Sequence, residues 1–407
     1  MHDPLDAPTR APRRVLPLII VAQFLGTSLW FVGNAVVDEV ATQWPEVSGA
    51  VGWLTSSVQL GFIVGTLVYA VFALADRFAA HRVFFASSVL AAAANAATLI
   101  APESFAWFVA GRFATGVFLA GIYPVGMKLA ASWFRQGLGN AIGLLVGALV
   151  LGTAFPHLLR TTALPWRPVI ISASVLALIG GIAVRLGVPE GPFVKRQRGF
   201  DPRGSLSVFR DPSFVRASLG YFGHMWELYA LWAFMPWALA VAWPGLAAED
   251  QSLWAFIVIA GGALGCGIGG RISLRTGSAR VAMVQLAISG ACCIASPWLL
   301  DVGGVPAMAL LLVWGITVVG DSPQFSTLGA RTAPPERVGT ALTLMTTIGF
   351  GITIGSIQLL SALAEPGGPT WLLIVLVPGP LAGLWAMAPL WRRDPTRPAA
   401  PPGATEG

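Results

Sequence analysis

The chain has few charged residues. Only 11% of its 407 residues are Asp, Glu, Lys or Arg, whereas 55% are hydrophobic. The scarce charges fall in short breaks between about twelve apolar runs of roughly twenty residues. Each run is long enough to cross a hydrocarbon core of about 30 Å as a helix, which satisfies its own backbone hydrogen bonds there. The pattern predicts an all-α polytopic membrane protein.

Cysteine is scarce as well. The three cysteines, Cys266, Cys292 and Cys293, all lie in apolar runs and lack the spacing of a metal site or a redox pair. We interpret them as reduced packing residues, and we expect no metal and no cofactor.

The chain also lacks nucleotide-binding and enzymatic signatures. It contains no G-x-x-x-x-G-K-[ST] segment and no soluble stretch large enough to hydrolyse a nucleotide, which argues against primary active transport. The run Gly265-Cys-Gly-Ile-Gly269 lies inside an apolar run and is interpreted as helix packing. His224 and Glu227 have no third ligand nearby in sequence, so a membrane-bound enzyme is not expected.

The apolar runs predict twelve transmembrane spans. Most Lys and Arg residues fall in or beside alternate breaks, which places both termini in the cytoplasm and suggests a bacterial inner membrane. The same sorting explains the net charge of +6 without a nucleic-acid partner. The first run lacks a small-residue cleavage site and is expected to stay as a signal anchor. The predicted spans are 15–37, 51–74, 83–100, 105–127, 139–159, 168–187, 214–242, 252–270, 281–299, 305–329, 338–362 and 370–391.

A weak internal repeat divides the chain into two halves. The segments 76–83 and 274–281 align at an offset of 198 residues, and 139–141 aligns with 339–341 at an offset of 200. We therefore predict an N-terminal six-helix half over 1–188, a cytoplasmic linker over 189–212, a C-terminal six-helix half over 213–391, and a disordered cytoplasmic tail over 392–407. Such duplication is typical of transporters that rock around a midplane site.

The repeated loops carry the residues of a known signature. Asp76, Arg77 and Arg82 match a degenerate G-x-x-x-D-R-x-G-R-R/K motif, and the second copy keeps Arg275 and Arg280. The second copy has Leu274 where Asp is usual. In the fourth run, Arg112-Phe-Ala-Thr-Gly116 has the form R-x-x-x-G.

With these motifs the chain resembles the major facilitator superfamily over essentially its whole length. The resemblance implies two pseudo-symmetric six-helix halves, loops that latch the cytoplasmic gate, and a proton-coupling role for Arg112. From Gly111 to Phe134 the chain is also similar to organic-anion and nitrate/nitrite porters. Spans two and eight contain no well-buried Arg, which disfavours nitrate itself.

Four ionisable residues lie well inside predicted spans: Arg112, His224, Glu227 and Asp321. A charge at the bilayer centre costs at least about 2.5–3.5 kcal/mol, so such residues mark a wet cavity or a buried partner. Glu227 and Asp321 can bind a proton, whereas Arg112 stays charged and can orient an anion. We predict Glu227, Asp321 and Arg112 as proton-coupling residues.

Further polar residues predict a solute site. Gln23, Thr27, Trp30 and Asn34 recur along one helical face. On the seventh span, His224, Glu227, Leu228 and Leu231 share a face, with Tyr221 and Tyr229 close by, and Asp321 shares a face with Gln324. Interhelical hydrogen bonding is the alternative interpretation for each of them. The predicted substrate-binding residues are Gln23, Trp30, Asn34, Arg112, Tyr221, His224, Glu227 and Gln324.

Glycines spaced by four on spans two, five, eight and eleven predict close helix contacts at the seam between the halves, for example Gly61/Gly65 and Gly261/Gly265.

Taken together, the patterns predict a monomeric secondary transporter that moves a small organic solute by alternating access. Carboxylated and other anionic solutes are among the candidates. A proton is the expected coupling ion, and the sequence does not distinguish symport from antiport. A drug or metabolite exporter of the same fold and a non-cycling sensor derived from a transporter are the alternatives.

Overall fold

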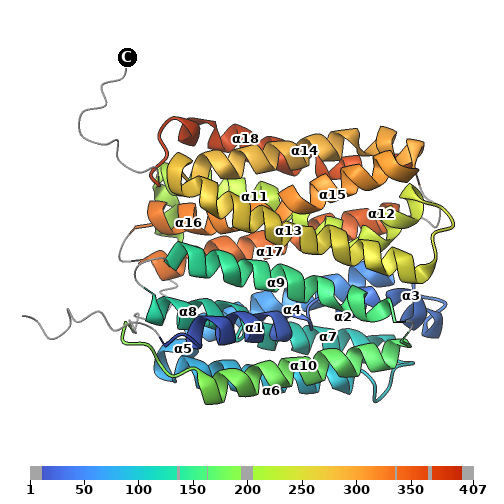
Figure 1. Cartoon of the computed structure of the whole chain (residues 1–407), viewed down its shortest axis with the longest axis horizontal. Coiled ribbons are helices and arrows are strands. Elements are labelled where there is room, and N and C mark those ends of the chain that lie inside the picture. Colours follow the sequence, from blue (N-terminus) through green and yellow to red (C-terminus); the bar gives the residue numbers. More distant parts are fainter. Residues whose placement is uncertain are drawn as a thin grey trace, which may run out of the picture.

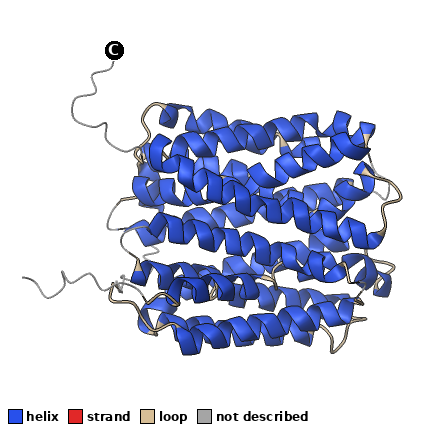
Figure 2. Cartoon of the chain, viewed as in Figure 1, coloured by secondary structure: helices blue, strands red, loops and turns tan. Residues whose placement is uncertain are grey.

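A computed structural model describes residues 12–134, 138–162, 164–193, 205–334, 337–364 and 369–396. All regular elements among these residues are helices (Figure 2). The predicted linker residues Lys195, Arg196, Arg198 and Arg203, and the tail from residue 397 onward, lie outside the described residues.

The N-terminal half contains α1 (Val15–Thr27), α2 (Val32–Ala35), α3 (Val37–Val40), η2 (Ala41–Gln43), α4 (Ala50–Val71), α5 (Leu74–Arg77), α6 (Ala80–Ala97), α7 (Phe105–Leu119), α8 (Tyr123–Trp133), α9 (Leu138–Arg160) and α10 (Trp166–Gly187). The C-terminal half contains η3 (Ser205–Arg210), α11 (Pro212–Ala233), α12 (Met235–Ala242), α13 (Ala248–Thr276), α14 (Ser278–Val302), α15 (Gly304–Gly320), α16 (Ser322–Thr332), α17 (Val338–Leu363), η5 (Thr370–Leu376), α18 (Pro378–Met387) and η6 (Ala388–Trp391).

The two halves lie side by side with their long helices roughly parallel. In Figure 1 the N-terminal half, blue to green, occupies the lower part of the bundle, and the C-terminal half, yellow to red, occupies the upper part. The halves meet where α9 packs on α13 and where α4 packs on α17. The helices α6 and α10 lie at one outer edge of the bundle, and α14 and α18 lie at the other.

Nine described helices are long and apolar enough to cross a membrane, or ten when the bent pair α11–α12 counts as one span. This test does not reach the predicted twelve. The helix α1 has only 13 residues before the chain breaks at Ser28, and α6 includes His81, Arg82 and Asn95 among its 18 residues, which lowers its hydropathy.

Four of the interrupted spans occupy equivalent places in the two halves. Span one breaks between α1 and α2, and span seven bends by 65° between α11 and α12. Span four breaks between α7 and α8, and span ten breaks at Asp321 between α15 and α16. Pro124 and Pro323 stand in the first turns of α8 and α16, where a missing N–H costs no helical bond. Irregular backbone at membrane depth is tolerated where it lines a cavity or is covered by protein.

The glycine pairs of spans two and eight bring helices together inside each half rather than between the halves. A Cβ on Gly61 of α4 would collide with the carbonyl oxygen of Phe113 on α7, and one on Gly265 of α13 would collide with that of Ile316 on α15. By contrast, a Cβ added to Gly143 of α9 or Gly351 of α17 would meet no neighbouring atom within 4 Å. The close packing therefore holds each half together as a body.

Candidate functional site

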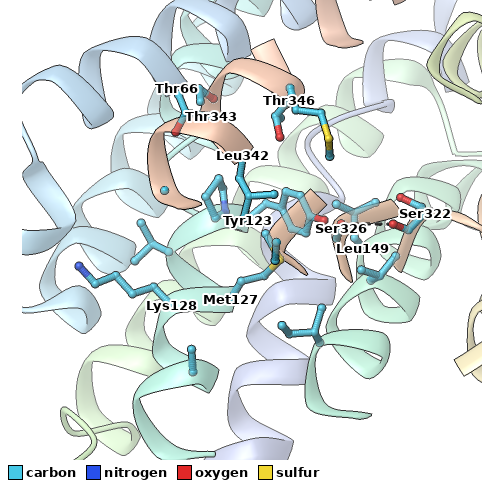
Figure 3. Close-up of a pocket in the computed structure, with 18 of the residues that line it drawn as sticks. Thr66, Tyr123, Met127, Lys128, Leu149, Ser322, Ser326, Leu342, Thr343 and Thr346 are labelled. Carbon is cyan, nitrogen blue, oxygen red and sulfur yellow. Dashed lines mark hydrogen bonds between the residues drawn. The ribbon is translucent and has the colours of Figure 1, made fainter. Parts of the chain in front are cut away.

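A cavity of about 1190 Å³ lies between the two halves. Its wall is formed mainly by α4 and α8 of the N-terminal half and by α11, α16 and α17 of the C-terminal half. Figure 3 shows Tyr123 near its centre, with Lys128 on one side, Ser322 and Ser326 on the other, and Thr346 across from it. A space of this size can hold an organic solute larger than a single ring.

The cavity opens at one end of the bundle, which we call the open end. Asp76, Lys128, Glu190 and Arg331 line the cavity there, in the α5 turn, near the ends of α8 and α16, and after α10. The ammonium group of Lys128 pairs with the carboxylate of Asp76 at 2.6 Å. Asp76, one of the predicted gating residues, therefore bonds within its own half in this conformation.

The opposite, closed end is sealed by an aromatic cluster of Trp30, Phe62, Tyr229 and Phe350. The ring centroid of Trp30 lies 4.8 Å from that of Phe62 and 5.9 Å from that of Tyr229, and the centroids of Phe62 and Phe350 are 4.6 Å apart. These rings come from both halves. They separate the cavity from the closed end with apolar surface that excludes water.

Direct contacts between α4 and α17 reinforce the closed end. The side-chain amide of Gln358 donates a hydrogen bond of 2.9 Å to the hydroxyl of Ser56, and the hydroxyl of Ser361 donates one of 3.3 Å to the backbone carbonyl of Gly49. The chain is thus in a conformation with one open and one closed gate.

The helix α11 presents two chemically different faces. Tyr221, Met225, Leu228 and Trp232 line the cavity, and their spacing of four, three and four residues follows one face of the helix. His224 and Glu227 point into the interior of the C-terminal half and are fully buried. Of the residues predicted to share a solute face on this helix, Leu228 and the nearby tyrosines reach the cavity, whereas His224 and Glu227 lie behind it.

Glu227 is held by three donors from neighbouring helices. The hydroxyl of Ser289 donates to its Oε2 at 3.0 Å, the thiol of Cys293 approaches Oε1 at 3.4 Å, and the indole N–H of Trp314 donates to Oε1 as well. Glu227 forms no ion pair with any described residue. A carboxylate buried without a cation is a group whose charge can be removed by protonation.

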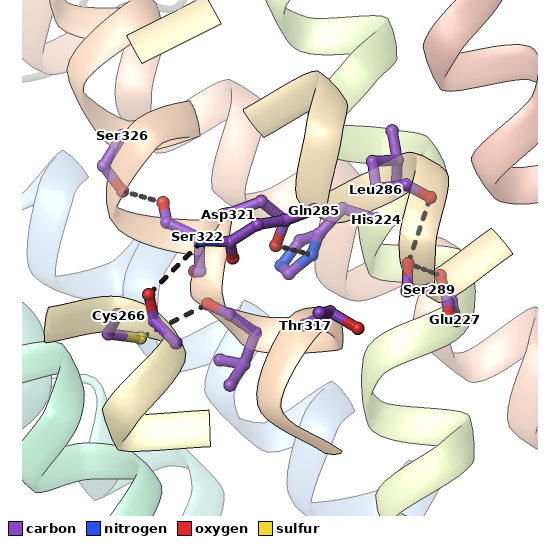
Figure 4. Close-up of polar contacts among 12 residues, drawn as sticks. His224, Glu227, Cys266, Gln285, Leu286, Ser289, Thr317, Asp321, Ser322 and Ser326 are labelled. Carbon is purple, nitrogen blue, oxygen red and sulfur yellow. Dashed lines mark hydrogen bonds and ion pairs between the residues drawn. The ribbon is translucent and has the colours of Figure 1, made fainter. Parts of the chain in front are cut away.

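His224 and Asp321 form a second buried pair. The imidazole Nδ1 lies 2.8 Å from Oδ1 of Asp321, and both side chains are fully buried. Asp321 occupies the break between α15 and α16 (Figure 4). The two acids and the histidine therefore gather in one region of the C-terminal half, which we call the buried acid region: His224, Glu227, Ser289, Trp314 and Asp321.

Arg112 lies in the N-terminal half, away from both acids. Its guanidinium group donates to Oδ1 of Asn95 at 2.9 Å and to the backbone carbonyl of Leu29 at 2.9 Å, and it also bonds the carbonyl of Trp30. These carbonyls are left without helical partners by the break after α1. In this conformation Arg112 stabilises the break and does not line the cavity.

The other predicted site residues lie at several places. Gln23 is buried without a hydrogen-bond partner among the described residues, Asn34 donates to the hydroxyl of Thr55 at 2.6 Å, and Gln324 is buried on α16. Trp30 belongs to the aromatic cluster. Of the predicted substrate-binding residues, only Tyr221 is in the cavity wall of this conformation.

The predicted gating arginines occupy the open end of the bundle. Arg77, Arg82 and Arg275 are exposed, whereas Arg280 donates a 3.3 Å hydrogen bond to the backbone carbonyl of Trp391 and stacks over its ring. The neighbouring N–H of Ala279 is bound by the carboxylate of Asp394 at 2.8 Å.

Several site residues were missed at the level of sequence. Lys128 falls just outside the predicted span, which ends at residue 127, whereas α8 continues to Trp133. Tyr123, Phe62, Phe350 and Trp314 are uncharged, and apolar runs contain many such residues. A tyrosine followed by proline in the middle of a span, Tyr123-Pro124, was a usable signal for a break.

Comparison with known proteins agrees with this fold. A sequence profile of the Major Facilitator Superfamily matches residues 15–356, and the chain belongs to this family. It is 27% identical over 195 residues to the putative uncharacterized transporter YgaY of Escherichia coli, and 29% identical over 162 residues to the niacin transporter NiaP of Acinetobacter baylyi. These alignments cover 45% and 34% of this chain, and 47% and 36% of the relatives.

The chain therefore spans less than half the length of these two relatives in alignment. A solved structure of the E. coli fucose:proton symporter FucP superposes with a TM-score of 0.64 and 16% identity, covering 93% of this chain and 99% of that one. At this identity the likeness concerns the fold. The superfamily and the two relatives are transporters, not enzymes, and this chain shares the fold of the superfamily.

Proposed function

We propose that the chain is a proton-coupled secondary transporter that carries a small organic solute by alternating access. The solute occupies the cavity, and protons bind in the buried acid region. The open end faces the cytoplasm, because the basic residues of the chain gather at that end. The aromatic cluster then closes the outward path.

One observation carries the proposal. The helix α11 places cavity residues on one face and the unpaired carboxylate of Glu227 on the other. Protonation of Glu227 changes the hydrogen bonds between its carboxyl group and Ser289, Cys293 and Trp314. If α11 shifts as a result, the cavity wall formed by its other face changes as well. Such a helix can make the affinity for solute depend on the proton, which is the thermodynamic requirement for coupling.

The alignment with a niacin transporter supports an organic solute, although it covers only about a third of this chain. An anionic solute, one of the candidates from the sequence, would need a fixed cation in the cavity. Lys128 is already paired with Asp76.

The test compares Glu227→Gln with the wild-type chain in proteoliposomes. Moving one proton inward is driven by about 2.3 kcal/mol per 100 mV plus about 1.4 kcal/mol per unit of pH gradient. The Gln variant mimics a permanently protonated acid and cannot release its proton. We expect uphill transport driven by a pH gradient to vanish while exchange at zero gradient survives.

A matched control is Glu249→Gln, which changes an exposed acid in the first turn of α13 and should leave both assays unchanged. Uphill transport by Glu227→Gln at the wild-type level would move the coupling role to Asp321. Reversing the pH gradient distinguishes symport from antiport in the same assay.

A further inference from the structure

The charged side chains of the cavity wall all lie at its open end. Among the described lining residues, those with a formal charge at neutral pH are Asp76, Lys128, Glu190 and Arg331. Two are basic and two are acidic, so their charges cancel, and Lys128 and Asp76 already neutralise each other. A solute that moves past this entrance meets no further fixed charge.

The deeper wall is aromatic, aliphatic and hydroxylated. It includes the rings of Phe62, Tyr221, Tyr229 and Phe350 and the side chain of Met225. Phe62, Tyr229 and Phe350 form a nearly continuous ring surface, with Tyr229 and Phe350 at a centroid distance of 5.2 Å. Such surfaces favour flat, apolar solutes, which stack against them or meet their edges.

Hydroxyl groups supply the polar contacts at this depth. Tyr123, Thr66, Thr343 and Thr346 contribute them to the wall, from both halves (Figure 3). Thr66 lines the cavity, and its hydroxyl has no hydrogen-bond partner among the described residues. Neutral hydroxyls both donate and accept, and they suit uncharged amide, carbonyl or hydroxyl groups.

The four intramembrane ionisable residues do not alter this picture. Arg112 is engaged with the α1 break, and His224, Glu227 and Asp321 lie in the buried acid region behind α11. None of the four is in the cavity wall. A charged solute would lose its hydration in the deep cavity without gaining an opposite charge, which is unfavourable.

From this distribution we infer that the solute is uncharged when bound, with a flat aromatic or comparably apolar body and at least one hydrogen-bonding group. The inference rests on the proposed function, because it assigns a solute class to the same cavity. A carboxylated aromatic solute is the competing outcome, because Arg331 at the open end forms no ion pair with a described residue and can hold an acid.

The test uses triples that share a ring system and carry a neutral, an anionic or a cationic side group. The probes are nicotinamide, nicotinate and 3-(aminomethyl)pyridine, together with indole-3-acetamide, indole-3-acetate and tryptamine. Thermal unfolding of the purified full chain is followed against the concentration of each probe, because a ligand that binds only the folded state raises the unfolding temperature. We expect an amide to stabilise the chain at a concentration at least tenfold lower than its acid or amine. An acid or amine that binds best, or a failure of both amides to bind, would overturn the inference.

A charge placed in the deep wall gives an independent test. Thr346→Lys adds a cation one helical turn from Phe350, and the preference should reverse toward the acid of each triple. Leu274→Lys adds the same charge at the exposed mouth and should leave the preference for the amide unchanged. A Thr346→Lys variant that folds and still prefers the amide would count against the inference. Phe350→Leu, which adds no charge, should weaken binding of the aromatic amides severalfold whether or not the lysine variant folds.

Counterflow in proteoliposomes separates this inference from the proposed function. Binding of amides without counterflow would contradict transport but leave the solute class intact. Counterflow of an acid, with no counterflow of its amide, would contradict the solute class and leave transport intact.

Discussion

Arg112 is a buried cation whose hydrogen bonds all go to neutral oxygens. Its planar guanidinium group reaches Asn95 and the two carbonyls of the α1 break at once. A lysine ammonium group is a compact point charge on a flexible stem and cannot bond all three in one plane. The residue therefore connects the R-x-x-x-G helix to the backbone that positions Trp30 in the aromatic cluster.

The first prediction concerns Arg112→Lys. Loss of the planar guanidinium group leaves buried carbonyls without hydrogen-bond donors. Each unsatisfied group lowers the free energy of unfolding by about 1–3 kcal/mol. We expect both Arg112→Lys and Arg112→Ala to unfold at lower temperature and to lose transport while still reaching the membrane. Arg13→Lys, at an exposed position outside the predicted gate, is the control. A Lys variant with wild-type stability and transport would show that the charge alone suffices.

The individual residues of the site were only partly predictable from sequence. Buried ionisable residues are conspicuous in apolar runs, and the structure does bury His224, Glu227 and Asp321 together. Their direction was less accessible, because a spacing of three or four residues places side chains on a common face but does not say which neighbour that face meets. Tyr221 and Glu227 lie six residues apart, about 240° around the helix, and face different surroundings.

At the scale of the helices, the closed end depends on the start of α4 lying against the end of α17. A Cβ on Gly52 would come within 2.6 Å of the Cβ of Ser361, closer than side chains pack. Gly49 beside it has a φ of 69°, a conformation that favours glycine. The contact therefore needs the smallest residue at both positions.

The second prediction follows from this contact. Gly52→Val should force α4 and α17 apart and shift the population toward chains open at this end. A single cysteine in place of Asn34, which lies near α4, should then be alkylated faster, while one in place of Lys128 should be alkylated more slowly. The native cysteines are buried and give a low background. Gly147→Val is the control, since its nearest neighbour lies 3.8 Å from the added Cβ. Unchanged alkylation rates in Gly52→Val would contradict the assignment of this contact as a gate.

A second helix-scale feature is the start of α14, which is capped by residues from the C-terminal segment. Asp394 accepts from the N–H of Ala279 at 2.8 Å, and Thr396 accepts from that of Ser278 at 2.6 Å. The signature loop at this position has Leu274 in place of an acid. Asp394 supplies a carboxylate to a helix N-terminus, which is a stabilising arrangement.

The third prediction is therefore that Asp394→Ala costs about 0.5–2 kcal/mol of stability, as loss of a capping side chain does. It would be measured as a lower unfolding temperature of the purified chain. Glu46→Ala serves as a comparison, because that acid is exposed in a turn outside any helix and its removal should change the temperature little. Equal effects of the two substitutions would remove the capping role.

At the scale of the whole molecule, the two halves and their fold were predictable because duplication leaves paired motifs and apolar runs of regular length. The breaks in spans one, four, seven and ten were not predicted, since hydropathy averages over about twenty residues and does not register a single irregular turn. Of these breaks, only those in spans one and seven lower the number of spans that the described helices support by length, nine or ten, because spans four and ten are long enough despite theirs.

The fourth prediction concerns the orientation of the bundle. Cysteines placed at Glu46 and Asp250 should be labelled from outside intact cells by an impermeant reagent, because their segments lie at the closed end. Cysteines at Arg82 and Arg275, at the open end, should be labelled only after the membrane is permeabilised. Reversed labelling of both pairs would turn the proposed orientation around.

The two faces of α11 have a consequence for how such proteins diversify. Tyr221, Met225, Leu228 and Trp232 touch the cavity, whereas His224 and Glu227 touch only the protein interior. Under the proposed function, we expect substitutions on the first face to alter the preference for solute without changing proton coupling, and substitutions on the second face to abolish coupling without changing the solute. We therefore expect related proteins to differ in solute through a few changes on the cavity face of this helix while they keep the residues of the buried acid region.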